Sequence, residues 1–324
     1  MVRRRYRGLI TAVHTPFFKD GRLNLDAVAG QAELMQRAGV EGVFVAGTTG
    51  ESHSLTLEER MQLATRWVDA AAGTSLAVVI HVGHNCIGDA QTLARHAEQI
   101  GANAIAALAP CYFKPPGLDE LLGTCAAIAG AAPALPFYYY DIPTMTGLKH
   151  SMPEFLQQGR QRIPNLAGLK YTNADLVQLQ ECLAVAGDDL EVLFGSDEIL
   201  LAATALGVQG AVGSTYNLAA PLYHELLQAF HNGDLARAQA LQRKSVQMVR
   251  TLQSFGFAEA DKTALKLLGL DLGPVRLPLA NLSEAEEEAL LEQLSALNVL
   301  GPDCVAPPTK PCASLASSLE SAKA

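Results

Sequence analysis

The chain has 324 residues, of which 49% are hydrophobic and 18% are charged, and its formal net charge at pH 7 is −9. This length allows a full hydrophobic core, in one large domain or two smaller ones. The acidic balance, without a basic stripe, argues against nucleic acid as a partner. No apolar run reaches the roughly 18 residues that a membrane helix needs, so we expect no membrane partner.

The six cysteines are widely and irregularly spaced and include no Cys-x-x-Cys pair. In a chain of this size, that pattern is typical of reduced thiols. The basic residues near the start are not followed by an apolar segment, so we expect no signal peptide and a cytoplasmic location.

Short apolar segments recur along the chain, with helical periodicity between them. The predicted strands are residues 8–13, 42–45, 77–82, 104–107, 137–140, 166–170, 191–194 and 210–212. Near-continuous apolar strands are expected when helices cover both faces of a parallel sheet. Eight such units predict a closed (β/α)8 barrel of the TIM type. An open doubly wound sheet is the alternative, but no Gly-x-Gly-x-x-Gly follows the first strand.

After the eighth strand the pattern becomes wholly helical, at residues 221–232, 234–253, 258–268 and 284–297. The first of these helices completes the eighth unit. We therefore predict a barrel over residues 1–232 and a helical extension over 233–300, packed on the side of the barrel. Residues 301–324, rich in Pro, Ser and Ala, are predicted to form a disordered tail.

Three helix starts carry capping signals. Thr56 with Glu59 and Ser283 with Glu286 fit the capping box, and Asn173 is predicted to be the N-cap of a helix over residues 174–184.

Active-site residues of such barrels come from the carboxyl ends of the strands. Lys170 ends the sixth predicted strand, where burial of an ammonium would be costly and favours the neutral amine. A neutral amine can form a Schiff base with a ketone. The alternative is a lysine whose amine reaches solvent at the strand end.

Other strand ends carry polar side chains that have both a structural and a functional interpretation. The turn Gly47-Thr48-Thr49-Gly50 can hold a carboxylate or simply close a strand. Tyr140 can move a proton at a reacting carbon or be a core residue. Asp197 and Glu198 can bind sugar hydroxyls or cap a helix dipole.

His81 and His84 form a His-x-x-His pair, and this spacing raises the question of a metal site. A zinc site needs a third and a fourth ligand, and the sequence offers no suitable candidates. We therefore expect no metal, and His14 and His53 are interpreted as pocket-wall or packing residues.

The strand-end motifs together resemble the pyruvate-dependent class I aldolases of the dihydrodipicolinate synthase and N-acetylneuraminate lyase family, over about residues 8–297. They are Gly47-Thr48-Thr49-Gly50-Glu51, Tyr140-Asp141-Ile142-Pro143, Gly168-Leu169-Lys170 and Gly213-Ser214-Thr215-Tyr216-Asn217. Two features are most similar to the lyase branch of this family. They are residues 135–140, and the combination of Asp197-Glu198 with the motif at residues 213–217.

The resemblance implies a role for each matching residue. Lys170 would form the Schiff base with the C2 ketone, Tyr140 would relay a proton at the C4 hydroxyl, and Thr48 and Thr49 would hold the carboxylate. The region that receives the sugar chain would comprise Thr172, Gly195, Asp197, Glu198 and Ser214. The implied reaction is retro-aldol cleavage of N-acetylneuraminate to pyruvate and N-acetylmannosamine, by a homotetramer without a cofactor.

Two positions depart from the synthase pattern. Met145 stands where the synthases carry an arginine that binds a second carboxylate, and an apolar side chain cannot do this. Cys111 interrupts the Tyr-Tyr pair of the synthases, which puts a contribution of Tyr112 across a subunit interface in doubt. An aldolase for another 2-keto sugar acid and a catalytically silent metabolite-binding barrel are the alternatives.

Overall fold

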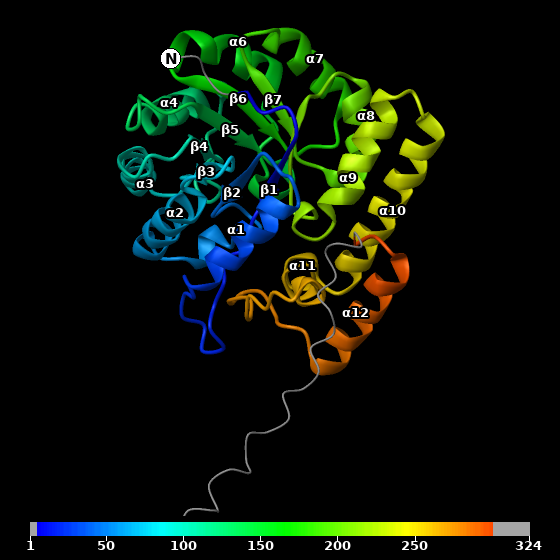
Figure 1. The fold of residues 1–324 in the computed structure, drawn as a ribbon. Coiled ribbons are helices and arrows are strands. Elements are labelled where there is room, and N and C mark those ends of the chain that lie inside the picture. The colour runs from blue at the N-terminus through cyan, green and yellow to red at the C-terminus, as the bar shows by residue number, and fades with distance from the viewer. Residues whose placement is uncertain (1–4, 301–324) are drawn as a thin grey trace, which may run out of the picture.

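The computed structural model describes residues 5–300 and shows a closed barrel of eight parallel strands (Figure 1). Each strand pairs with its neighbours in sequence, and β1 closes the barrel by pairing with β8. The strands are β1 (Leu9–Ala12), β2 (Gly42–Val45), β3 (Ala77–His81), β4 (Ala104–Ala107), β5 (Phe137–Asp141), β6 (Leu166–Tyr171), β7 (Glu191–Phe194) and β8 (Gly210–Gly213). The predicted barrel is confirmed, and each strand overlaps its predicted segment.

Helices surround the strands and bury the outer face of the barrel. They are α1 (Ala27–Arg37), α2 (Leu57–Ala71), α3 (Ile87–Gln99), α4 (Leu118–Ala129), α6 (Met152–Arg162), α7 (Leu176–Ala186), α8 (Leu200–Ala205) and α9 (Tyr216–His231), with the short α5 (Pro143–Thr146) after β5. None of the helices within residues 5–300 is long and apolar enough to cross a membrane.

The C-terminal extension consists of α10 (Leu235–Ser254), α11 (Phe257–Ala264), the 3₁₀ turn η3 (Leu265–Leu268) and α12 (Glu284–Leu297). These elements group on one side of the barrel, where α10 packs against α9 (Figure 1). The boundary that we predicted at residue 232 falls between α9 and α10, and the predicted tail over 301–324 lies outside the described residues.

Two of the three predicted helix starts are confirmed, since Thr56 and Ser283 both form complete capping boxes. The prediction for Asn173 is wrong. The helix begins at Leu176, and Asp175 is its N-cap, accepting a hydrogen bond from the Gln178 amide at 2.9 Å. Asn173 instead accepts a hydrogen bond from the Asp175 amide, which forms an Asx turn ahead of the helix.

Candidate active site

The carboxyl ends of the strands surround a cavity of about 390 Å³. Every residue that the sequence marked for the site lines this cavity: Thr48, Thr49, Tyr140, Lys170, Thr172, Gly195, Asp197, Glu198 and Ser214. His14, interpreted as a pocket-wall residue, also lines it. The structure thus brings together side chains from five strand ends that lie up to 166 residues apart.

Lys170 and Tyr140 are direct neighbours on adjacent strands, because β5 and β6 pair them in register. The register shifts by one residue between Phe137 and Tyr138, so that β6 bulges around Gly168. Gly168 has a φ of 151°, and a Cβ there would collide with the backbone of Glu191 on β7. Only glycine fits this bulge, which sets the register that pairs Lys170 with Tyr140.

The Lys170 side chain is buried, with 4% of its surface exposed. Its Nζ lies 3.9 Å from the centre of the Tyr140 ring and 4.2 Å from the centre of the Phe44 ring. Within residues 5–300 it makes no hydrogen bond or ion pair. Lys170 is therefore not a side chain that extends along the surface: its stem is buried between two aromatic rings, and the residue lines the cavity.

Two hydroxyl contacts connect the Thr48-Thr49 turn to other strand ends. The Thr48 hydroxyl lies 3.3 Å from the Tyr140 hydroxyl, and the Thr49 hydroxyl lies 2.8 Å from the Ser214 hydroxyl. Threonine hydroxyls and the backbone N–H groups of such a turn can donate hydrogen bonds to a carboxylate. The turn therefore presents neutral donors beside the buried amine.

Polar groups at the ends of β6 and β7 form another part of the wall. A Cβ on Gly195 would collide with the Thr172 hydroxyl, so glycine permits this close approach. Asp197 is buried and accepts hydrogen bonds from the Thr215 amide at 3.0 Å and the Thr215 hydroxyl at 2.7 Å. Burial raises the pKa of Asp197 to about 6. Glu198 is half-buried beside it.

The C-terminal extension contributes residues that the sequence analysis missed. Val249, Gln253, Phe257, Ala258 and Asp261, from α10 and α11, all line the cavity. The sequence predicts an extension on the side of the barrel, and the structure also brings that extension to the cavity. No local signal could have revealed this, because helical periodicity does not say which neighbour a helix covers.

Of the two positions that depart from the synthase pattern, Met145 lies at the cavity, and Cys111 is half-buried and precedes the exposed Tyr112 and Phe113. Met145 lines the cavity with 62% of its surface exposed, and nothing at this position offers a bidentate donor. Tyr112 and Phe113 are exposed and stack edge to face, with their ring centres 5.0 Å apart.

Residues 5–300 contain no group of three His, Cys, Asp or Glu side chains placed to hold a metal ion. His81 lies in the barrel, where its Nδ1 is 2.9 Å from the Ala46 carbonyl oxygen. Burial holds the pKa of His81 well below its usual range. His84 is partly exposed and lies 3.5 Å from Asp89.

A buried lysine beside a tyrosine, at the carboxyl ends of neighbouring strands of a (β/α)8 barrel, fits the class of Schiff-base aldolases. The chain belongs to the dihydrodipicolinate synthetase family, whose model matches residues 5–297.

Individual relatives are similar over almost their whole length. The chain is 41% identical to N-acetylneuraminate lyase from Gallus gallus over 299 residues, covering 90% of this chain and 97% of the relative. The solved structure of Proteus mirabilis N-acetylneuraminate lyase has 40% identity and a TM-score of 0.89, covering 92% of this chain and all of the other. The sialic acid aldolase of Aliivibrio salmonicida has 39% identity and a TM-score of 0.90, covering 92% and 99%.

Proposed function

We propose that the protein is a class I aldolase that cleaves N-acetylneuraminate to pyruvate and N-acetylmannosamine. The observation that carries this proposal is the buried Lys170 amine, paired in register with Tyr140 and bordered by the Thr48-Thr49 turn. The similarity to N-acetylneuraminate lyases supports the choice of substrate within the family.

The reaction begins when the Lys170 amine attacks the C2 ketone of the open-chain sugar acid and water leaves, which forms an iminium. The C4 hydroxyl loses its proton through Tyr140 as the C3–C4 bond breaks. The electron pair of that bond enters the iminium to form an enamine, and C4 becomes the aldehyde of N-acetylmannosamine. Protonation at C3 and addition of water then release pyruvate and the free amine. The iminium is the electron sink, so this route needs no cofactor.

The remaining residues of the cavity would bind the two ends of the substrate. Thr48 and Thr49 donate hydrogen bonds to the carboxylate of the keto acid, which holds C2 within reach of Lys170. The sugar chain lies against Thr172, Gly195, Asp197, Glu198 and Ser214. Carboxylates accept hydrogen bonds from hydroxyl groups, and this chemistry suits a polyol better than a short keto acid.

Borohydride trapping tests the proposed chemistry directly. Reduction in the presence of pyruvate should convert the iminium into a stable amine, and peptide mapping should place the adduct on Lys170. Samples without pyruvate, and the Lys170→Met variant, serve as controls. If the wild-type protein forms no adduct at Lys170, the proposed Schiff-base chemistry is wrong and the silent barrel is favoured.

A second measurement addresses the substrate. Turnover of N-acetylneuraminate should exceed that of 2-keto-3-deoxygluconate, measured as released pyruvate. A preference for the latter would instead favour the related aldolase for another 2-keto sugar acid.

We also propose that the protein acts in the cytoplasm as a homotetramer. Four cysteines within residues 5–300 are free, which supports a reducing compartment. The family resemblance is the basis for the tetramer, and light scattering of the purified protein would measure its mass.

A further inference from the structure

The Thr48-Thr49 turn is bounded by two residues with strained backbones. Ala46 and Glu51 both have a φ of 54°, in the left-handed region that side chains other than glycine rarely adopt. Such conformations cost roughly 1–3 kcal/mol each and persist only where the surroundings impose them. Both ends of this turn therefore need contacts that hold them in place.

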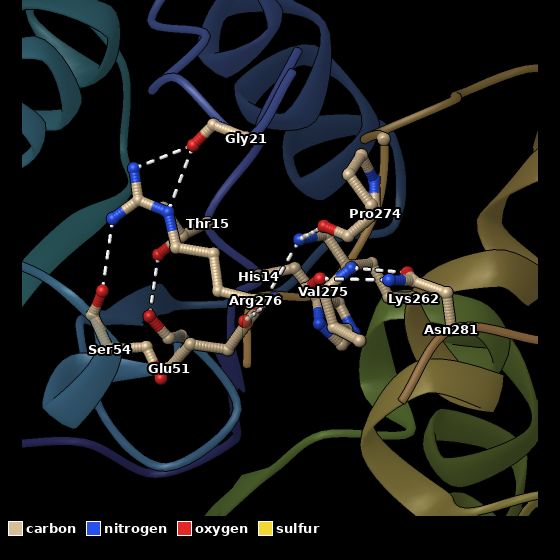
Figure 2. A network of polar contacts seen from close by, with 12 residues as sticks. His14, Thr15, Gly21, Glu51, Ser54, Lys262, Pro274, Val275, Arg276 and Asn281 are labelled. Atoms are coloured by element: carbon tan, nitrogen blue, oxygen red, sulfur yellow. Dashed lines mark hydrogen bonds and ion pairs between the residues drawn. The ribbon is translucent and has the colours of Figure 1, made fainter. Parts of the chain in front are cut away.

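Contacts from distant segments hold the backbone at both ends of the turn. At one end, the Nδ1 atom of His81 lies 2.9 Å from the Ala46 carbonyl oxygen. At the other end, the Thr15 hydroxyl donates a hydrogen bond to the Gly50 carbonyl oxygen at 2.6 Å (Figure 2).

The side chain of Glu51 connects the turn to two distant segments of the C-terminal extension. Its carboxylate accepts hydrogen bonds from Lys262 Nζ at 2.9 Å and from the Arg276 amide at 2.8 Å (Figure 2). Lys262 also donates to the Pro274 carbonyl oxygen at 2.6 Å. The side chains of Lys262 and Glu51 are 1% and 2% exposed, so the ion pair is almost fully removed from water.

The segment that carries Arg276 is itself fixed to the barrel. The Arg276 guanidinium forms an ion pair with Glu59 and donates hydrogen bonds to the Gly21 and Ser54 carbonyl oxygens. Two parts of the C-terminal extension thus hold the Glu51 carboxylate: Lys262 of α11 bonds to one oxygen, and the segment anchored by Arg276 bonds to the other.

We propose that Lys262 is a positioning residue for catalysis, which acts through Glu51 to hold Thr48 and Thr49 in the geometry that binds the carboxylate of the keto acid. This inference rests on the proposed function. It makes α11 part of the active site, although Lys262 touches no substrate.

The chemistry of a buried ion pair favours a positioning role over a purely stabilising one. Desolvation of two charges offsets most of their attraction, so apolar replacement of a buried pair is often neutral or stabilising. The two charges instead fix the orientation of the groups that bond to them. Nζ can bond to both Glu51 and the Pro274 carbonyl, which fixes the strained residue in one orientation.

The test uses the full chain and the condensation of pyruvate with N-acetylmannosamine. The variants are Lys262→Met, Glu51→Gln and the double variant that carries both changes. Lys266→Met is the matched control, because Lys266 pairs with Glu287 at 2.7 Å in a partly exposed position one turn away. Thermal unfolding of every variant establishes that it is folded.

We expect KM for pyruvate to rise at least tenfold in the double variant, while KM for N-acetylmannosamine changes less than twofold and Lys266→Met resembles the wild type. Lys262→Arg should recover part of the pyruvate affinity, since it restores a donor to Glu51. A folded double variant with unchanged KM for pyruvate, or equal increases in both KM values, would overturn the inference.

Failure of this inference differs from failure of the proposed function. If the wild-type protein gives a borohydride adduct but all variants bind pyruvate equally well, only the positioning role is lost. If single variants do not fold, the double variant decides the question, because it leaves no unpaired charge. If the double variant also fails to fold, the role of the ion pair between Lys262 and Glu51 is to stabilise the protein, and the inference is overturned.

Discussion

Replacing Lys170 with methionine should abolish turnover and at the same time stabilise the fold. Lys170 is 4% exposed, and within residues 5–300 its amine has two aromatic ring faces but no hydrogen-bonding or ionic partner. Methionine has a similar length and no polar atom that needs a partner. The substitution therefore removes the nucleophile and keeps most of the packing.

The size of the gain follows from two opposing contributions. A desolvated cation over an aromatic face gains about 2 kcal/mol, whereas the effective penalty for burying an ion is several kcal/mol. A neutral amine without a partner would still cost about 1–3 kcal/mol. We therefore expect Lys170→Met to raise the free energy of unfolding by about 1–3 kcal/mol. At about 2 °C for each kcal/mol in a large domain, Tm should rise by about 2–6 °C.

Differential scanning calorimetry of the wild type and the variant, without ligand, measures the stability change. Pyruvate release from N-acetylneuraminate measures activity on the same samples. A variant that unfolds at a lower temperature would show that the amine has structural partners, and would refute the reasoning from burial. Residual wild-type turnover would refute the assignment of the nucleophile.

Three further predictions concern other residues at the carboxyl ends of the strands. Tyr140→Phe should lower kcat by about 10²–10⁴-fold while the borohydride adduct still forms, because only the proton relay is lost; an unchanged kcat would assign the relay elsewhere. Glu198→Ala should raise KM for N-acetylneuraminate more than KM for a truncated keto acid, and equal increases would count against a contact with the sugar chain. Asp141→Asn should stabilise the protein at high pH, because burial raises the pKa of Asp141 from 3.8 to about 7. The folded state keeps this proton to higher pH than the unfolded state, so the wild type loses stability as pH rises between about 4 and 7. Because the pKa of Asp141 rises by about 3, the variant should be more stable than the wild type at pH 8 by at most about 4 kcal/mol in unfolding free energy. Urea unfolding of the wild type and the variant at pH 4 and pH 8 measures this difference. If the difference in unfolding free energy is the same at both pH values, the raised pKa of Asp141 is not its cause.

The sequence by itself determined the barrel and most of the cavity. Buried parallel strands leave a local signal, since their residues are apolar on both faces, and this signal located all eight strands. Because the carboxyl ends of the strands in such a barrel meet at one mouth, the sequence alone assigns the polar side chains at those ends to one site. Lys170 and Tyr140 are the clearest examples.

The tertiary structure alone decided what surrounds these side chains. The bulge that pairs Lys170 with Tyr140 depends on the contact of Gly168 with β7, and the pair between Glu51 and Lys262 joins residues 211 positions apart. Hydrophobic periodicity records which face of a helix is buried but carries no information about what it is buried against. For that physical reason, the approach of α11 to the barrel mouth could be found only by packing the whole chain.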